Sequence, residues 1–367
     1  MRGCLEVLYM SKSQVYMYNI ILALIAAILW GSSIPALKVF AGEINSVMMA
    51  GLLYLGSGIV LGFILIMRQF IGKFKIGEHK EAQLERSDLI WLISSILSGS
   101  VAAPICLMKG LSLTPATVAS LFLNFEGVMT IIWGGLFFKE YLGNRMWLVT
   151  AMLFGGGLLL AAPSGEFINW NVTGPSLLIA ACALWGLDNN LTRNISGKDP
   201  VVLTCCKGLS GGIAATSIAI FNKALIPQFS SIIIILTIGA ACSGVSLILF
   251  IYALRHLGAA RTSACFGMFP FFGAILSVMF LHEALTAPII LAFVIMALAI
   301  IVLLLEKHAH MHTHENISHN HLHTNDDHHL HLHNGTEGAE PHSHGHTHEP
   351  ISHEHAHMPD LHHRHLH

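Results

Sequence analysis

One acidic residue in the middle of a long apolar block is the clearest chemical signal in the sequence. Glu126 lies near the centre of the block 114–138. If this block crosses a membrane, a charge at its centre costs about 2.5–3.5 kcal/mol, so the carboxylate must face a cavity, pair with a cation or carry a proton. Two interpretations stay open. Glu126 either binds substrate or couples transport to protons, or it only packs between helices and forms a hydrogen bond to a neighbour near Asn124.

Two further charges, Lys207 and Asp188, lie inside apolar blocks later in the chain. Lys207 could neutralise Glu126 or Asp188, or bind a substrate carboxylate. Its alternative is to extend its ammonium group to the membrane interface along an apolar stem. Asp188 begins a polar group that includes Asn189, and this group either lines the inner mouth of a cavity or ends the apolar segment.

Two tryptophans occupy matching places deep within apolar blocks, whereas interfacial tryptophans gather near the lipid headgroups. Trp30 and Trp185 either line a central cavity or fill helix packing. Together with the polar residues they make up the predicted substrate or coupling site: Trp30, Asn124, Glu126, Trp185, Asp188, Asn189 and Lys207.

Histidines dominate the end of the chain, where 22 of the 25 lie between His308 and His367, often as His-x-His. Neutral imidazole suits Zn, Ni, Co and Cu, and a high local density of ligands gives affinity without a folded site. The tail is expected to be a disordered cytoplasmic segment that binds such ions, or one that only buffers metal or protons. No cofactor is required. The predicted metal ligands are His308, His310, His312, His314, His342, His344, His346 and His348.

The composition of the remaining chain indicates that its solvent is lipid. Of the 367 residues, 54% are hydrophobic and 11% charged, against roughly 25% charged residues in a soluble domain. The apolar blocks are about twenty residues long, which is the length of a membrane-spanning helix, and a helix satisfies its own backbone groups in lipid. We predict an all-α integral membrane protein with ten transmembrane helices. These lie at 19–40, 46–68, 88–109, 114–138, 145–163, 174–193, 200–221, 229–254, 261–281 and 285–305.

The distribution of lysine and arginine sets the expected orientation. With a cytoplasmic N-terminus, fifteen of these residues fall on the inside and three (Lys38, Lys109 and Lys223) on the outside. We therefore expect a multi-pass protein of the cytoplasmic (inner) membrane with both termini in the cytoplasm. The seven cysteines show no C-x-x-C spacing and do not indicate a zinc or disulfide framework.

The two halves of the chain carry matching motifs. Leu29-Trp30-Gly31 matches Leu184-Trp185-Gly186, and at the same offset Lys38 falls on Arg193. Five helices per half is an odd number, so the second copy must enter the membrane upside down, as in transporters built from inverted repeats. The predicted organisation is a cytoplasmic N-terminus at 1–18, repeats at 19–163 and 174–305, and the tail at 306–367.

A second pair of motifs closes the fourth helix of each half. Phe138-Lys139-Glu140-Tyr141-Leu142 matches Leu281-His282-Glu283-Ala284-Leu285. Because Glu140 and Glu283 follow matching helix ends, we expect them to form hydrogen bonds across loops and to set helix geometry.

These motifs resemble the EamA-type transporters of the drug/metabolite superfamily over about residues 20–305. The resemblance implies a ten-helix inverted-repeat fold with a central cavity and transport of small molecules, commonly export. The sequence departs from the family pattern at Glu126, in the region where the second repeat carries Pro270, so the site chemistry of other members need not carry over. The residues that carry the resemblance are Leu29-Trp30-Gly31-Ser32-Ser33, Leu136-Phe137-Phe138-Lys139-Glu140, Leu184-Trp185-Gly186, Phe280-Leu281-His282-Glu283 and Phe269-Pro270-Phe271.

Three functions stay open at this point. The leading one is an alternating-access exporter of a small organic metabolite, such as an amino acid or an amphipathic compound. The second is a Ni, Co or Zn exporter whose tail collects the metal, and the third is a metal-responsive membrane sensor without flux. No Walker loop is present, so ATP does not drive the protein directly, and no enzyme activity is expected.

The expected partners follow from the same reasoning. They are the lipid bilayer, a small-molecule substrate and, as an option, protons. A homodimer is allowed, and nucleic acid is not expected because the net charge is −2.

Overall fold

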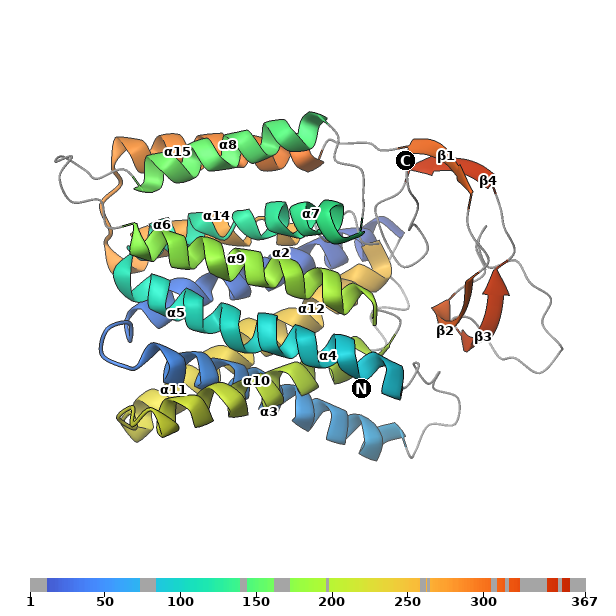
Figure 1. The fold of residues 1–367 in the computed structure, drawn as a ribbon, viewed down its shortest axis with the longest axis horizontal. Helices are drawn as coiled ribbons and strands as arrows, with labels where there is room; N and C mark the ends of the chain where they lie inside the picture. The colour runs from blue at the N-terminus through green and yellow to red at the C-terminus, as the bar shows by residue number, and fades with distance from the viewer. Residues whose placement is uncertain are drawn as a thin grey trace.

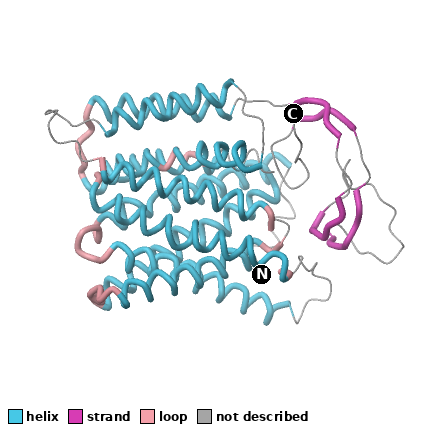
Figure 2. The backbone as a smooth tube through the Cα atoms, in the orientation of Figure 1, coloured by secondary structure: helices cyan, strands magenta, loops and turns pink. Residues whose placement is uncertain are grey.

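The computed structural model of the protein describes most of the chain. The described residues of the body are 12–72, 84–138, 144–161, 172–195, 198–257, 262 and 265–304, and those of the tail are 309–313, 317–323, 342–348 and 352–356. The body consists of helices that run alongside one another, and the tail contributes strands at one end of the bundle (Figure 1, Figure 2).

The first half of the chain folds into helices that match the segments predicted from its apolar blocks. The first begins at Lys12, earlier than the predicted residue 19. The third contains a π-helical turn in its middle, and the fourth is interrupted between α6 and α7. The elements are α2 (Lys12–Lys38), α3 (Ser46–Gly72), η2 (Arg86–Asp88), α4 (Leu89–Ser95), η3 (Ile96–Ala102), α5 (Ala103–Leu113), α6 (Ala116–Phe122), α7 (Phe125–Phe138) and α8 (Asn144–Ala161).

The second half also contains a π-helical turn. The turn η4 interrupts the eighth predicted segment as η3 interrupts the third. The elements are α9 (Thr173–Arg193), α10 (Pro200–Phe221), α11 (Phe229–Ile238), η4 (Gly239–Val245), α12 (Ser246–Leu257), α14 (Phe269–Leu281) and α15 (Ala287–Leu304).

Local sequence fixes several helix ends. The side chain of Asn45 accepts hydrogen bonds from the first free N–H groups of α3, and that of Asp199 does the same for α10, which begins at Pro200. These are standard N-terminal signals, because a short polar side chain satisfies an unpaired N–H and proline needs no hydrogen bond at that place. At its other end, α14 stops at His282, whose backbone is left-handed (φ 52°).

Among the described residues, six helical stretches are long and apolar enough to cross a membrane. Three shorter apolar helices lie at Trp147–Leu160, Phe269–Leu281 and Ala287–Val302. The structure therefore confirms a helical membrane protein, whereas the count of ten crossings stays a prediction. The six stretches are Met17–Lys38, Ser46–Arg68, Arg86–Leu113, Ala116–Phe137, Pro200–Phe221 and Phe229–Ala253.

Small residues allow the helices of the two halves to approach closely. The most extensive contact joins α3 to α10, where Gly58 meets the backbone of Gly208 and Leu209 so tightly that an added Cβ would collide with it. Close approach at small residues is the usual way in which membrane helices pack, because lipid provides no hydrophobic driving force between them.

Packing between the halves is reciprocal. The turn η3 of the first half packs against α9 and α10, and η4 of the second half packs against α2 and α3. Helices α8 and α15, the last of each half, pack against each other along one side of the bundle (Figure 1).

The tail differs from the disordered segment that we predicted, because it contains four short strands (Figure 2). Strand β1 (Ala309–Thr313) pairs with β4 (Ser352–Ala356), and β2 (Ile317–His323) pairs with β3 (His342–His348), both antiparallel. The His-x-His alternation has the two-residue period of a strand, which composition alone did not reveal. Of the predicted metal ligands, His308 and His314 lie outside the described residues.

Candidate functional site

An ion pair within the bundle connects two helices of the second half. The Nζ atom of Lys207, on α10, lies 2.7 Å from each carboxylate oxygen of Asp188, on α9. The exposed fractions of the two side chains are 15% and 9%. Of the partners considered for Lys207 from sequence, the structure selects Asp188.

Two hydroxyl groups complete the surroundings of Asp188. Ser95, on α4, donates to Oδ1 at 2.5 Å, and Thr192 donates to the same atom at 3.1 Å. Lys207 also contacts the Thr192 hydroxyl at 3.2 Å. A buried ion pair is tolerated only when additional hydrogen bonds satisfy both charges, and this cluster meets that requirement with residues from both halves.

The π-helical turn η3 makes room for the carboxylate. A Cβ atom on Gly99 would overlap with the side chain of Asp188. The carbonyl oxygen of Gly99 accepts hydrogen bonds from the indole N–H of Trp185 and from the hydroxyl of Tyr54, both at 2.9 Å. Trp185, one of the predicted site residues, is 8% exposed. Its hydrogen bond therefore connects α9 to the turn η3 inside the packed bundle.

The second carboxylate of the bundle has different surroundings. Glu126 lies in the first turn of α7 and accepts one hydrogen bond from the side chain of Asn189, on α9, at 3.1 Å. Asn189 also donates to the hydroxyl of Thr130 at 3.1 Å. Asn189 and Gly127 are exposed. Among the described residues, no lysine or arginine forms an ion pair with Glu126.

The remaining predicted site residues form other contacts. Asn124 is buried, and its amide donates to the carbonyl of Leu121 at 2.8 Å. Trp30, on α2, packs against Phe266 and Phe269 with ring centroids 6.3 Å apart in both cases. The structure thus unites Asp188 with Lys207 and Glu126 with Asn189, and it places the two tryptophans in separate contacts.

Sequence reasoning did not identify several residues of these clusters. Ser95 and Thr192 are hydroxyl side chains in apolar or mixed segments, where their types alone give no signal. Gly99 and Tyr54 become important only because the π-helical turn brings them to Trp185 and Asp188.

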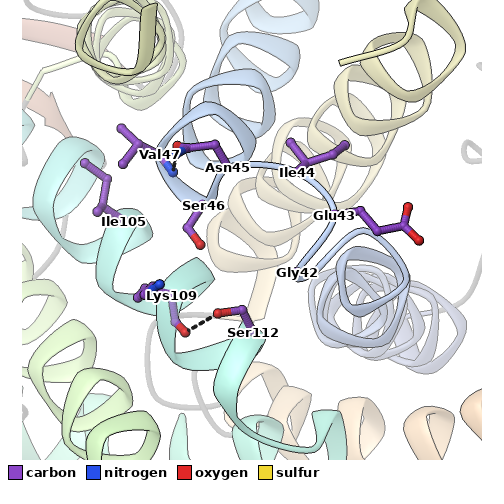
Figure 3. A pocket seen from close by; sticks show the side chains of 9 residues that line it. All are labelled: Gly42, Glu43, Ile44, Asn45, Ser46, Val47, Ile105, Lys109 and Ser112. Carbon is purple, nitrogen blue, oxygen red and sulfur yellow. Dashed lines mark hydrogen bonds between the residues drawn. The ribbon is translucent and has the colours of Figure 1, made fainter. Parts of the chain in front are cut away.

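A cavity of about 440 Å³ lies at the end of the bundle where α2 connects to α3 (Figure 3). Lys109 and Ser112, from the last turns of α5, face it, and Glu43 points away from them. None of the predicted site residues lines this cavity. Its lining residues are Gly42, Glu43, Ile44, Asn45, Ser46, Val47, Ile105, Lys109 and Ser112.

The part of the chain that the structure describes in side-chain detail holds no group of three or more histidine, cysteine, aspartate or glutamate side chains placed to bind a metal. The predicted tail ligands that the structure places lie on β1 (His310, His312) and β3 (His342, His344, His346, His348).

The model of the EamA-like transporter family matches the chain twice, at residues 17–162 and 172–305. The chain belongs to the EamA-like transporter family. It is therefore a multi-pass membrane transporter of the drug/metabolite superfamily, as the motifs indicated.

Individual relatives agree with this assignment. An uncharacterized transporter from Methanothermobacter thermautotrophicus is 29% identical over 269 residues, which cover 70% of this chain and 78% of the relative. A protein of known crystal structure superposes with a TM-score of 0.55 at 15% identity, covering 78% of this EamA-family chain and 96% of the other. The latter likeness concerns the fold alone.

Proposed function

We propose that this EamA-family protein exports a small organic metabolite by alternating access between two inverted five-helix repeats. Both termini would lie in the cytoplasm and the body in the cytoplasmic membrane. The two family matches and the reciprocal packing of η3 and η4 support a duplicated architecture. In such transporters the site lies where the two repeats meet.

The observation that carries the proposal is the hydrogen bond between Glu126 and Asn189. It connects the two family-matched regions, and it leaves the carboxylate without a cationic partner among the described residues. A carboxylate with one neutral partner, beside the exposed residues Gly127 and Asn189, is able to exchange a proton or a substrate group as access alternates. Lys207 pairs with Asp188 and not with Glu126. We therefore assign the coupling role to Glu126.

A transition-metal exporter is the second candidate, because the tail strands place histidines opposite one another. His310 lies opposite His355 and His312 opposite His353 in the ladder of β1 and β4. Directly opposite residues of an antiparallel pair have Cβ atoms about 4.5–5.5 Å apart, a spacing at which two imidazoles can share one metal ion.

Counterflow in proteoliposomes tests these functions against each other. The full chain and a variant ending at residue 305 would be tested with an amino-acid panel and with Zn, Ni and Co. Organic flux that survives removal of the tail supports the metabolite exporter. Metal flux that requires the tail overturns it in favour of the metal exporter, and the absence of any flux would favour the sensor.

A further inference from the structure

The fourth predicted segment starts at a sharp break that leaves backbone groups without helical partners. Helix α5 ends at Leu113, Thr114 is extended (φ −133°, ψ 148°), and Pro115 precedes the first residue of α6, Ala116. At such a junction the last carbonyls of one helix and the first N–H groups of the next need partners from elsewhere.

Two charged side chains provide these partners. Lys38 donates to the carbonyl oxygens of Leu111 at 2.7 Å and Thr114 at 2.5 Å. The two carboxylate oxygens of Glu283 accept from the N–H groups of Ala116 at 2.7 Å and Thr117 at 2.8 Å. The hydrogen bonds predicted from sequence for Glu283 are thereby confirmed, whereas Glu140 lies outside the described residues.

The signs of these charges match the helix ends that they contact. A cation is stabilised at the C-terminal end of a helix and an anion at the N-terminal end, so Lys38 suits α5 and Glu283 suits α6. Bonds to charged groups are also the strongest hydrogen bonds in proteins. The break between α5 and α6 is therefore held by four strong contacts.

The Glu283 contacts connect the two halves of the chain, whereas the Lys38 contacts join two helices of the first half. Lys38 is the last residue of α2, and Glu283 follows α14; α2 and α14 pack against each other, and α6 packs against α14. Near the contact of these three helices, a Cβ on Gly273 would meet the Ser120 side chain and the Gly31 carbonyl. The junction is thus fastened to the ends of α2 and α14.

The geometry points to Lys38 and Glu283 as a two-point latch that holds the outer end of the transporter closed. This inference rests on the proposed alternating-access function and on the proposed orientation, which places these helix ends outside. Opening toward the outside that carries the α5–α6 junction away from the ends of α2 and α14, which pack against each other, would separate it from both Lys38 and Glu283. The four contacts would then be exchanged for water, so the latch favours the state that is closed on the outside.

Spin-label distance measurements on the full-length protein in lipid nanodiscs test the latch without knowledge of the substrate. Labels would be placed at Ser112, which is partly exposed on α5, and at Leu285, which is exposed beyond α14, in a background with the native cysteines replaced. The variants are Glu283→Gln and Lys38→Met. Matched controls are Glu43→Gln and Lys109→Met, which make the same charge changes at the same end of the bundle without contacting the α5–α6 junction.

Each latch variant is expected to add a population with a longer distance and to lower the closed-to-open ratio by at least about tenfold, because Glu283→Gln loses one charge-assisted hydrogen bond and Lys38→Met loses two. The controls are expected to keep the wild-type distribution. Unchanged distances in both latch variants, or equal changes in the controls, would overturn the latch. If Glu283→Gln does not fold, as judged by size-exclusion chromatography, Lys38→Met decides alone. Counterflow that fails in the wild type while the distances respond would instead reject the proposed function.

Discussion

Two carboxylates of the bundle, Asp188 and Glu126, differ in the number and kind of their partners. Asp188 accepts from one ammonium group and two hydroxyl groups, whereas Glu126 accepts from a single exposed amide. An ionised group that is fully satisfied contributes to the architecture, because moving it would leave buried charges unpaired. A group with one neutral partner is free to change its protonation or its ligand. Burial within a membrane bundle therefore does not by itself mark a functional charge.

Removal of the ammonium group from the Asp188 cluster should have the largest effect on stability. We expect Lys207→Met to lower the free energy of unfolding by about 3–5 kcal/mol, because it leaves a buried carboxylate without its cation. Thermal unfolding of the purified protein in detergent measures this loss.

The matched control for that variant removes both charges. The double variant Asp188→Asn with Lys207→Met should recover most of the loss, since no unpaired charge then stays in the bundle. Equal destabilisation by the single and the double variant would show that the pair is not the source of the effect.

The space around a neighbouring glycine differs between the two carboxylates. An added Cβ on Gly99 would collide with the Asp188 carboxylate, which Lys207 and Ser95 hold in place, whereas Gly127, beside Glu126, has no atom within 4 Å of an added Cβ. We expect Gly99→Ala to cost about 1–3 kcal/mol through overpacking. Gly127→Ala should instead stabilise α7 by about 0.5–1 kcal/mol, because alanine favours a helix. Similar unfolding temperatures for the two variants would contradict the difference in packing.

A lysine with one largely exposed partner gives the smallest effect and a test by pH. Lys198 lies 3.0 Å from Glu85 and 3.2 Å from Asp88. Burial lowers the pKa of Lys198, but the hydrogen bonds and charges of Glu85 and Asp88 outweigh it and raise the pKa above its usual 10.5. We expect Lys198→Met to cost less than Lys207→Met, since Glu85 is largely exposed and its pair with Lys198 contributes little.

The sign of this pH dependence follows from linkage. Because the pKa of Lys198 is raised in the folded state, the stability that its ion pairs contribute is complete below pH 10.5. That stability is lost as the pH rises through the pKa of the folded state. The difference in unfolding temperature between wild type and Lys198→Met should therefore be constant from pH 7 to 10 and shrink above that range. A difference that grows with pH would contradict the ion pair.

The membrane fold was predictable because its signals are long and local. Blocks of about twenty apolar residues identify helices regardless of their neighbours, and short motifs such as Leu184-Trp185-Gly186 indicated the family that the two matches confirm. The early start of α2 at Lys12 and the break between α5 and α6 were less predictable, because helix ends depend on capping contacts with distant residues. The strands of the tail escaped a prediction based on composition.

The candidate site was predictable only in its residue types. Sequence identified Glu126, Asp188 and Lys207 as unusual charges, and it left two partners open for Lys207. The choice of Asp188 depends on the π-helical turn that brings Ser95 and Gly99 to α9, which is a feature of packing between the halves. The role of Glu126 in coupling stays a prediction.

Uptake driven by a pH gradient in proteoliposomes tests whether Glu126 is the coupling residue. The probe is the solute that counterflow identifies, and the variants are Glu126→Gln and, as a control on an exposed carboxylate, Glu43→Gln. We predict that wild type and Glu43→Gln accumulate the solute in response to the gradient, and that Glu126→Gln loses this accumulation while its unfolding temperature stays close to that of the wild type. Accumulation by Glu126→Gln at the wild-type level would contradict the assignment of Glu126 as the coupling residue.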